Sequence, residues 1–297
     1  MKNLPLISVI MPVYNSEEFL EEAIESILGQ TYQNIELIVS YDKSIDSSLD
    51  ILEKYQEKDP RIILLIGENQ GLIRSLNRAI DVSKGKYIAR MDADDVSLPN
   101  RLEEQSKFLQ KNNLDLCGGH CLLIDSTGHI DGMHVVPISH NMCILSMLFK
   151  VPFVHPSVMI KKEFLDKNSL RYGQSQFKDA EDFDFWVRAQ ENGAMFGNLD
   201  DIVLRYRVVP NSLSKINKTH VLKDSKYITR KFFKNNRKKV SNILNSGLPD
   251  YLNCEEKSLL VRYVFNDIIR LRFSNLHLIK HISKKIIVNS VLSEILR

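Results

Sequence analysis

Residues 87–95 read Tyr87-Ile88-Ala89-Arg90-Met91-Asp92-Ala93-Asp94-Asp95, a strand-like run that ends in a cluster of acids. In open parallel sheets, ligands bind outside the carboxyl ends of the strands, which is where this cluster falls. Carboxylates at i and i+2 of an extended segment project to the same side and can share a divalent cation. Capping the next helix would need only one of these acids, and three so close repel one another unless a cation is present. We therefore expect Mn²⁺ or Mg²⁺ here.

Working outward, similar apolar runs occur upstream at residues 7–13, 35–41 and 62–66, and segments of helical period lie between them. This alternation predicts an α/β fold of Rossmann type, with a mostly parallel sheet flanked by helices. Asn15, with Glu18 three residues on, has the pattern of a capping box for the first helix. A later helix is expected from 97 to about 111, and another from Glu181 to Asn192, ending at Gly193.

Charge is distributed unevenly along the 297 residues. From residue 215 onward there are 18 Lys and Arg against 6 Asp and Glu, a balance of +12, whereas the rest carries 22 against 31, or −9. We expect residues 1–214 to form an acidic body. Residues 215–297 would form a basic, α-helical C-terminal extension. Four irregularly spaced cysteines and no apolar run of 18 residues predict a cytoplasmic protein.

Four motifs together resemble those of the family 2 glycosyltransferases of the GT-A fold. They are Pro12-Val13-Tyr14-Asn15, Asn69-Gln70-Gly71-Leu72, Gly85 to Asp95, and Ala180-Glu181-Asp182. They occur in the family's order and cover about the first 210 residues. The resemblance implies a catalytic domain over 1–214, with nucleotide binding in about 1–95 and acceptor binding in about 96–214. A more distant likeness is to bacterial lipooligosaccharide and capsule transferases that add hexose or N-acetylhexosamine.

The resemblance implies a nucleotide-sugar site made of Pro12, Val13, Tyr14, Asn15, Asp42, Asn69, Gly71, Arg74, Asp92, Ala93 and Asp94. Pro12, Val13 and Tyr14 would line the uracil and ribose pocket. Asp42 would bond the base, and Arg74 would lie near the diphosphate. Asp92 would hold ribose or sugar hydroxyls, and Asp94 the metal.

The same resemblance makes Asp182 the catalytic base. Inversion at an anomeric carbon needs a base that takes the proton of the acceptor hydroxyl, and an acid near a helix start is expected to stay ionised. The alternative is a first-turn acid of the helix that bears Trp186. His155 and Glu181 would lie on the acceptor side together with Trp186, although a buried structural role is open for both His155 and Trp186.

Two segments of the sequence depart from the family's pattern. Tyr41 and Lys43 stand where the family shows an acid and a glycine, and Val209 stands where a metal- or diphosphate-binding His is common. Arg207 or Lys215 could substitute for that His electrostatically.

The basic extension interleaves Lys and Arg with Phe232 and Phe233. It predicts either a peripheral contact with anionic lipid on the inner face of the plasma membrane or a solvated face on helices that pack against the catalytic domain. Nucleic acid is not an expected partner because no reader motif is present. Homo-oligomerisation is left open.

The expected function is inverting transfer of a sugar from a UDP-sugar to a surface glycan or its lipid-linked precursor. One alternative is a catalytically silent homologue that serves as a binding subunit of a glycan-assembly complex. Another is a sugar-nucleotide pyrophosphorylase, which is disfavoured because residues 11–16 contain no glycine to cradle a triphosphate.

Overall fold

The computed structural model describes residues 4–68, 70–177, 179–209 and 218–245. Asn69, Lys215 and the helices expected beyond residue 245 lie outside this part. The chain divides into two compact units, one formed by residues 1–143 and 152–225 and the other by residues 144–151 together with residues from 226 onward. The boundary expected at residue 214 stays a prediction.

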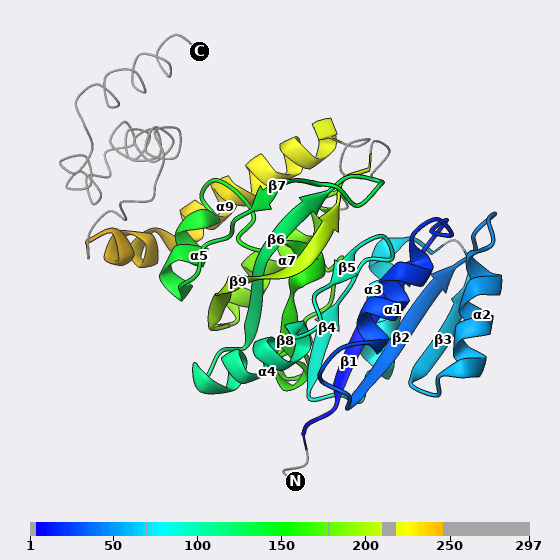
Figure 1. Ribbon diagram of the computed structural model, residues 1–297. Coiled ribbons are helices and arrows are strands. Elements are labelled where there is room, and N and C mark those ends of the chain that lie inside the picture. The colour runs from blue at the N-terminus through cyan, green and yellow to red at the C-terminus, as the bar shows by residue number, and fades with distance from the viewer. Residues whose placement is uncertain (1–3, 69, 178, 210–217, 246–297) are drawn as a thin grey trace. The chain divides into compact units, whose positions relative to one another are not determined.

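The first unit is built on a nine-stranded sheet of order β3-β2-β1-β4-β8-β6-β9-β5, with β7 paired to β6 (Figure 1). The strands are β1 (Ile7–Val13), β2 (Ile35–Asp42), β3 (Ile62–Gly67), β4 (Tyr87–Arg90), β5 (Val96–Ser97), β6 (Leu116–Ile124), β7 (Ile130–His134), β8 (Met159–Lys161) and β9 (Phe196–Arg207). The first four strands are parallel to one another. β8 is antiparallel to both of its neighbours, so the second half of the sheet is mixed.

The helices fill the connections. They are α1 (Leu20–Leu28), α2 (Ser48–Lys58), α3 (Leu72–Val82), α4 (Arg101–Lys111), α5 (His140–Ser146), the 3-10 turn η1 (His155–Ser157), α6 (Lys162–Lys167), α7 (Glu181–Glu191) and α9 (Lys218–Asn245). The expected positions of the first four strands and of the helix ending before Gly193 are confirmed to within a few residues.

Alternation along the strands determines which helix covers which face. Val9 and Met11 of β1 belong to one core cluster with buried residues of α1, α2 and α4. The residue between them, Ile10, points to the opposite face, on the side where α3 packs against β1 and β2 (Figure 1). The parallel register pairs Val13 with Tyr41 and Asp42 with Gly67. The loops that leave β1, β2, β3 and β4 therefore open at one edge of the sheet.

The predicted capping box at Asn15 is wrong. Helix α1 begins at Leu20, five residues later, with Phe19 as its N-cap. Asn15 has a left-handed backbone (φ 47), and its Oδ1 accepts the N–H of Ile45 at 3.0 Å. The side chain thus joins the loops after β1 and β2. Its oxygen bonds a backbone N–H of the neighbouring loop and not an N–H of the helix.

Two glycines of β6 allow close packing against β9. A Cβ on Gly119 would lie 2.7 Å from a methyl group of Val203, and one on Gly118 would lie 2.6 Å from Oδ1 of Asn198. The register between β6 and β9 shifts on either side of His120. These contacts hold the two long strands of the second half together.

In the second unit, the described part of α9 from residue 226 has an apolar and a basic face. Ile228, Phe232 and Val240 are buried, whereas Lys231, Lys234 and Lys238 are exposed. Across the part of the chain that the structure describes, none of the helices combines the length and the apolar character that crossing a bilayer requires.

Candidate active site

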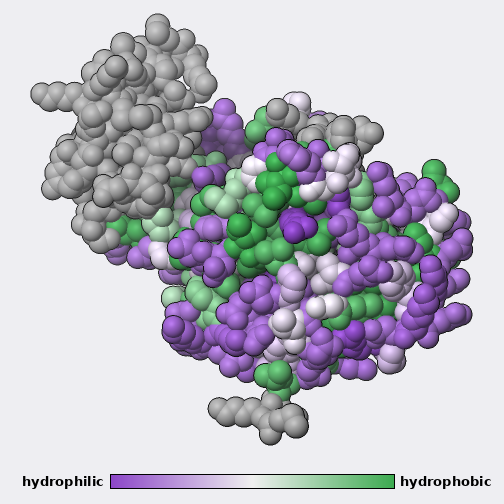
Figure 2. Space-filling model, viewed as in Figure 1, coloured by the Kyte–Doolittle hydropathy of each residue, from purple (hydrophilic) through white to green (hydrophobic). Residues whose placement is uncertain are grey.

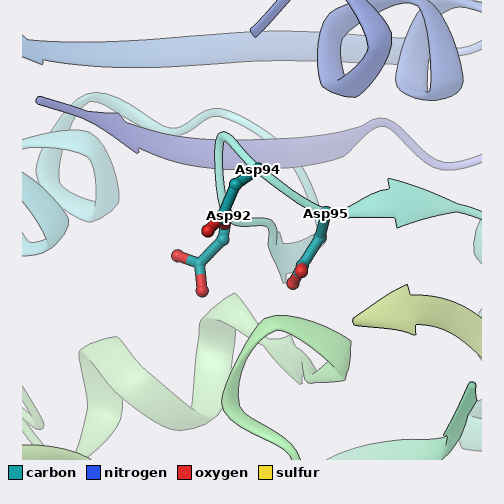
Figure 3. A group of neighbouring side chains, drawn as sticks. All are labelled: Asp92, Asp94 and Asp95. Carbon is teal, nitrogen blue, oxygen red and sulfur yellow. The ribbon is translucent and has the colours of Figure 1, made fainter. Parts of the chain in front are cut away.

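The acidic loop lies between β4 and β5. One carboxylate oxygen from each of Asp92, Asp94 and Asp95 lies within 4.8 Å of the other two. Figure 3 shows Asp92 and Asp94 close together, with Asp95 beside the start of β5. Three oxygen ligands at this separation are a candidate site for a hard divalent cation.

Asp95 provides a test of whether a cation fits. Its side chain is buried, and Oδ1 accepts the backbone N–H of Arg207 at 2.8 Å. The other oxygen, Oδ2, has no hydrogen-bond partner among the described residues. Burial, together with the charges of Asp92 and Asp94, raises the pKa of Asp95 well above its usual range. A buried carboxylate with one unpaired oxygen and like charges beside it is stabilised by a cation.

The carboxylate of Asp94 would likewise be stabilised by a cation. Burial and then the neighbouring Asp92 carboxylate raise the pKa of Asp94 to about 6. The residues present therefore fit a divalent metal ion. The resemblance had suggested Asp94 alone as the ligand, and the structure adds Asp95 as a candidate, because only the fold shows that its second oxygen is unpaired.

Arg207 holds the acidic loop in place from β9. Its Nε donates to the carbonyl oxygen of Asp94 at 2.8 Å, and its Nη1 donates to that of Asp125 at 3.0 Å. Its Nη2 donates to Oε2 of Glu22 at 2.5 Å, and the guanidinium lies over the ring of Phe19. All three nitrogens thus bond protein groups. The charge of Arg207 also acts on the carboxylate of Asp94 and lowers its pKa. The expectation that Arg207 substitutes electrostatically for the His missing at position 209 stays a prediction.

Arg90 is a functional residue that the sequence analysis missed. It ends β4, and its side chain is 6% exposed. Nη1 donates to Oδ2 of Asp92 at 2.5 Å, and Nη2 pairs with Oδ1, so the contact is bidentate. The available signal was a single charged residue inside an otherwise apolar strand that runs into three acids.

The expected catalytic base lies at the start of α7. Oδ1 of Asp182 accepts the N–H of Phe183 at 2.6 Å. Burial raises the pKa of Asp182, while the Phe183 N–H and the charge of Arg90 act in the opposite direction. Burial and the Asp182 charge raise the pKa of Glu181 to about 7. Desolvation therefore outweighs the first-turn donor in the pKa of Asp182. That Asp182 stays ionised, ready to accept a proton, remains a prediction.

The residues predicted to lie on the acceptor side differ in burial and in their contacts. His155 is half-buried, and its Nε2 lies 2.9 Å from the hydroxyl of Tyr172. Burial, with Arg90 nearby, lowers the pKa of His155 well below its usual value, so its ring is neutral. Trp186 is fully buried and makes edge contacts with the rings of Phe153 and His155. Trp186 is a core residue, which corrects its place among the acceptor-side residues.

Helix α3 is joined directly to the segment that precedes α7. Nδ2 of Asn77 donates to the carbonyl oxygen of Tyr172 at 3.0 Å, and the N–H of Tyr172 donates to Oδ1 of Asn77 at 2.9 Å. The Tyr172 ring then stacks on Phe185 of α7, with centroids 4.3 Å apart. This pair of hydrogen bonds connects the helix that carries Arg74 with the helix that carries Asp182.

Asp42 supports the loop before α3. Its two oxygens accept the N–H groups of Gln70 at 3.0 Å and Gly71 at 2.8 Å. Gly71 has φ 78, a conformation that favours glycine, and is the N-cap of α3. The structure thus shows Asp42 fixing the loop that would face a nucleotide. Its contact with a base stays a prediction.

The remaining predicted nucleotide residues differ in exposure. Tyr14 is 58% exposed at the open edge, and Arg74 is exposed on α3. The side chains of Val13 and Ala93 lie in the core, so only their backbone atoms can face a ligand. Pro12 is half-buried in β1. Asn69 lies outside the described residues.

Arg90 influences the pKa values of acids in both parts of the predicted site. Its charge acts on Asp94 and Asp95 on one side and on Glu181 and Asp182 on the other. The acidic loop and the start of α7, nearly ninety residues apart in the sequence, therefore share one electrostatic environment.

Comparison with known proteins gives a consistent result. The model of the family described as glycosyl transferase family 2 matches residues 8–168. An uncharacterised glycosyltransferase of Methanocaldococcus jannaschii is 36% identical over 246 residues, covering 80% of this chain and 83% of that protein. The O-antigen biosynthesis glycosyltransferase WbnJ of Escherichia coli is 34% identical over 220 residues, covering 72% and 84%.

Solved structures share the fold at low sequence identity. Residues 1–349 of S. aureus TarS in complex with UDP-GlcNAc superpose with a TM-score of 0.58 at 18% identity, covering 96% of this chain and 79% of that one. The chain spans half of the longer TarS chain. The mannosyltransferase PcManGT of Pyrobaculum calidifontis, in complex with GDP-Man and Mn²⁺, superposes with a TM-score of 0.57 at 16% identity, covering 94% and 86%. The predicted α/β fold of GT-A type, with a C-terminal helix, is confirmed.

Proposed function

The chain belongs to the family 2 glycosyltransferases, and on this premise we propose that it moves a hexose or N-acetylhexosamine from a UDP-sugar to a hydroxyl group of a glycan acceptor, with inversion. The main support is the arrangement around Arg90. A cluster of three acids that fits a cation follows β4, and Asp182 lies half-buried at the start of α7. The charge of Arg90 acts on the pKa values of Asp94, Asp95 and Asp182. Inverting transfer needs both groups beside one reacting carbon.

Asp182 would act on the acceptor. Its carboxylate takes the hydroxyl proton while the acceptor oxygen attacks the anomeric carbon and the bond from that carbon to the diphosphate oxygen breaks. The raised pKa of Asp182 makes it a stronger base than an exposed aspartate. A divalent ion held by Asp94, with Asp92 and Asp95 beside it, would supply positive charge to the leaving diphosphate.

The choice of substrates draws on the relatives. The TarS structure holds UDP-GlcNAc, whereas PcManGT holds GDP-Man with Mn²⁺. We propose a UDP-sugar donor because the motif from Pro12 to Asn15 resembles that of UDP-sugar enzymes. Similarity to the O-antigen biosynthesis glycosyltransferase WbnJ supports a bacterial surface polysaccharide, or its lipid-linked precursor, as acceptor.

A lipid-linked acceptor would suit a protein that touches a membrane surface. Helix α9 carries nine Lys and Arg and a single acid, Asp224. Its exposed residues Tyr227, Arg230, Lys231 and Lys234 lie at helical spacing before the kink at Asn236 and so share one face, and the exposed Lys238 follows the kink. Basic residues near an anionic bilayer contribute about 1 kcal/mol each. This supports peripheral binding to anionic lipid.

Two substitutions test the function. Asp94→Ala should abolish Mn²⁺-dependent hydrolysis of a UDP-sugar, with water as acceptor, and should also abolish metal-dependent UDP binding. Asp182→Asn should lower turnover by about 10²–10⁴-fold yet leave UDP affinity near that of the wild type. Asp50→Asn, at an exposed position on α2, is the matched control.

The outcomes distinguish the alternatives. Turnover retained in Asp182→Asn would remove Asp182 from the role of base. A wild-type protein that binds no UDP and hydrolyses no UDP-sugar would instead be a silent binding subunit.

A further inference from the structure

We propose that Arg78 of α3 is a positioning residue for the nucleotide end of the site: its guanidinium joins the ends of β2 and β3 and so holds Asp42 where it supports the loop before α3. The effect on nucleotide binding rests on the proposed function. Arg78 lies outside the four sequence motifs, and the similarity to known proteins assigns it no role.

Four hydrogen bonds connect the Arg78 guanidinium with the two strands. Nε donates to Oγ of Ser40 at 3.2 Å, and Nη2 lies 2.8 Å from the same oxygen. Nη2 also donates to the carbonyl oxygens of Tyr41 and Leu65, each at 3.0 Å. Ser40 is fully buried and pairs with Leu65 in the parallel register. The side chain thus joins β2 to β3 near the carboxyl ends of both strands.

Alternation along β2 places the Asp42 side chain on the face of the sheet that α3 covers. Tyr41 belongs to the core cluster on the side of α1 and α2, so its neighbours Ser40 and Asp42 face α3. The carbonyl that Arg78 binds is part of the peptide bond between Tyr41 and Asp42. Fixing this carbonyl therefore fixes the direction in which the Asp42 carboxylate leaves the strand.

Helix α3 is attached to β2 at two points on one face. At its N-cap, the N–H of Gly71 donates to Oδ2 of Asp42 at 2.8 Å. Arg78 follows seven residues later, which is about two helical turns. The exposed Arg74, four residues before Arg78, shares this face. The place of Arg74, which is expected near the diphosphate, therefore also depends on Arg78.

Gly67, the last residue of β3, leaves room for the guanidinium. A Cβ at this position would lie 2.3 Å from Nη1 of Arg78 and 2.9 Å from its Cζ and its Nη2, and these are the three nearest atoms. The φ of Gly67 is not positive, so the backbone conformation does not require glycine here. The space that the guanidinium needs accounts for glycine at this position.

The first test measures the Kd of UDP by calorimetric titration. Arg78→Ala should raise it about tenfold, the size of one charged hydrogen bond lost between Asp42 and the ligand. The rise should be equal with Mn²⁺ and with EDTA, because Asp42 ends β2 and is not part of the acidic loop after β4. Asp94→Ala, in contrast, should act only when Mn²⁺ is present.

Arg61→Ala is the matched control. The Arg61 guanidinium also bonds several segments, donating to Oε1 of Gln33 at 3.1 Å and to the carbonyl oxygen of Leu28 at 3.2 Å, but it lies just before the start of β3. Its removal should lower Tm and leave the Kd of UDP within about twofold of the wild type. If Arg78→Ala gives the same result, Arg78 is only a structural residue and the proposal is overturned.

A double-mutant cycle tests the pairing of Arg78 with Gly67. Gly67→Ala alone should displace the guanidinium and raise the Kd of UDP as much as Arg78→Ala does. In the Arg78→Ala background, the same change should alter the Kd by less than about twofold. A full effect of Gly67→Ala in that background would show that Gly67 acts without Arg78, and the pairing would be refuted.

Hydrogen exchange tests the positioning role without a ligand. The amides of Gln70 and Gly71, which donate to Asp42, should exchange about tenfold faster in Arg78→Ala than in the wild type. In Arg61→Ala they should exchange at the wild-type rate. Unchanged exchange in Arg78→Ala would contradict the proposal. A wild-type protein that binds no UDP, together with faster exchange in Arg78→Ala, would refute the proposed function and support the positioning of Asp42 by Arg78.

Discussion

At the scale of single residues, the acids of the site are oriented by backbone N–H groups more than by ion pairs. Asp42 receives two such donors, and Asp95 and Asp182 receive one each. A single N–H fixes the direction of a carboxylate but does not offset the loss of water around it. This is why the pKa values of Asp95 and Asp182 are raised although both are hydrogen-bonded.

Glu181 gives a pH-dependent prediction. Its pKa rises from 4.5 to about 7 on folding, so the folded protein binds more protons than the unfolded chain in that window, and stability falls as the pH rises through it. Glu181→Gln removes this ionisation. The variant should match the wild type in Tm near pH 4 and exceed it by a few degrees at pH 8, measured by differential scanning fluorimetry.

Glu57→Gln on α2, at an exposed glutamate, is the control and should give the same small difference from wild type at both pH values. A Glu181→Gln variant that is less stable than the wild type at pH 8 would contradict the raised pKa.

At the scale of single residues, the sequence analysis identified candidate site residues by residue type and by their order along the chain. It found the acidic cluster and Asp182, because acids after a strand and at a helix start are visible as patterns. It did not find Arg90, and it did not show which groups the donors of Arg207 bind. The backbone N–H of Arg90 bonds Val158, and the guanidinium of Arg207 bonds Glu22, and both partners lie more than sixty residues away in the chain.

At the scale of elements, the parallel half of the sheet was predictable and the rest was not. β1 and β2 are long, apolar and β-branched, whereas β8 has three residues and β7 is exposed along its whole length. Short or exposed strands acquire their conformation from their partners, and β6 can pair with β8, β7 and β9 only once the chain has folded. The start of α1 was misplaced for a similar reason, since Asn15 bonds another loop.

Arg207 gives a prediction for β9. Arg207→Lys keeps the charge but loses the planar set of donors to Glu22 and to the carbonyls of Asp94 and Asp125. We expect a loss of about 2–4 kcal/mol in the free energy of unfolding, with weaker Mn²⁺-dependent UDP binding because the acidic loop shifts. Urea denaturation and calorimetric titration measure the two effects.

Arg205→Lys, two residues earlier on the same strand and exposed, should change stability by less than about 0.5 kcal/mol. If Arg207→Lys retains full stability and loses only UDP binding, then Arg207 contacts the ligand after all.

Helix α9 gives a second prediction. Replacing Lys231, Lys234 and Lys238 together by Glu reverses the exposed basic face without touching its buried residues. Co-sedimentation with vesicles that contain phosphatidylglycerol should fall at least tenfold at 0.1 M salt, and binding of the wild type should weaken at 0.5 M salt.

The same reversal at the exposed Lys58, Lys84 and Lys111 changes the net charge equally and should leave most of the vesicle binding intact. Equal losses in the two triple variants would mean that overall charge, not the face of α9, is responsible.

At the scale of the whole molecule, the face drawn in Figure 2 is covered mainly by hydrophilic side chains, with apolar areas between them. The sheet combines a parallel half, whose loops after β1 to β4 carry the predicted nucleotide residues, with a mixed half that brings α7 to the same site. The sequence indicated the strands of the first half. It could not indicate how the second half folds back, because that depends on β-sheet pairings between distant segments.

Ligand binding by the whole protein gives the last prediction. A ligand at about 100 times its Kd stabilises the folded state by about 2.7 kcal/mol. A UDP-sugar with Mn²⁺ should therefore raise Tm by about 5 °C or more, and the same sugar with EDTA should give a smaller shift. A larger shift with GDP-sugars would change the proposed donor.

The paired hydrogen bonds between Asn77 and Tyr172 have a consequence for local opening. Helix α3 cannot separate from the segment before α7 without breaking both bonds. Two stretches that lie far apart in sequence should therefore open as one cooperative unit in native-state hydrogen exchange. In the wild type, the amide of Tyr172 should exchange with the same free energy as the amides of α3, and Asn77→Ala should make it exchange on its own. Local opening of the backbone in this enzyme would then be determined by hydrogen bonds between distant segments, and not by the order of those segments in the chain.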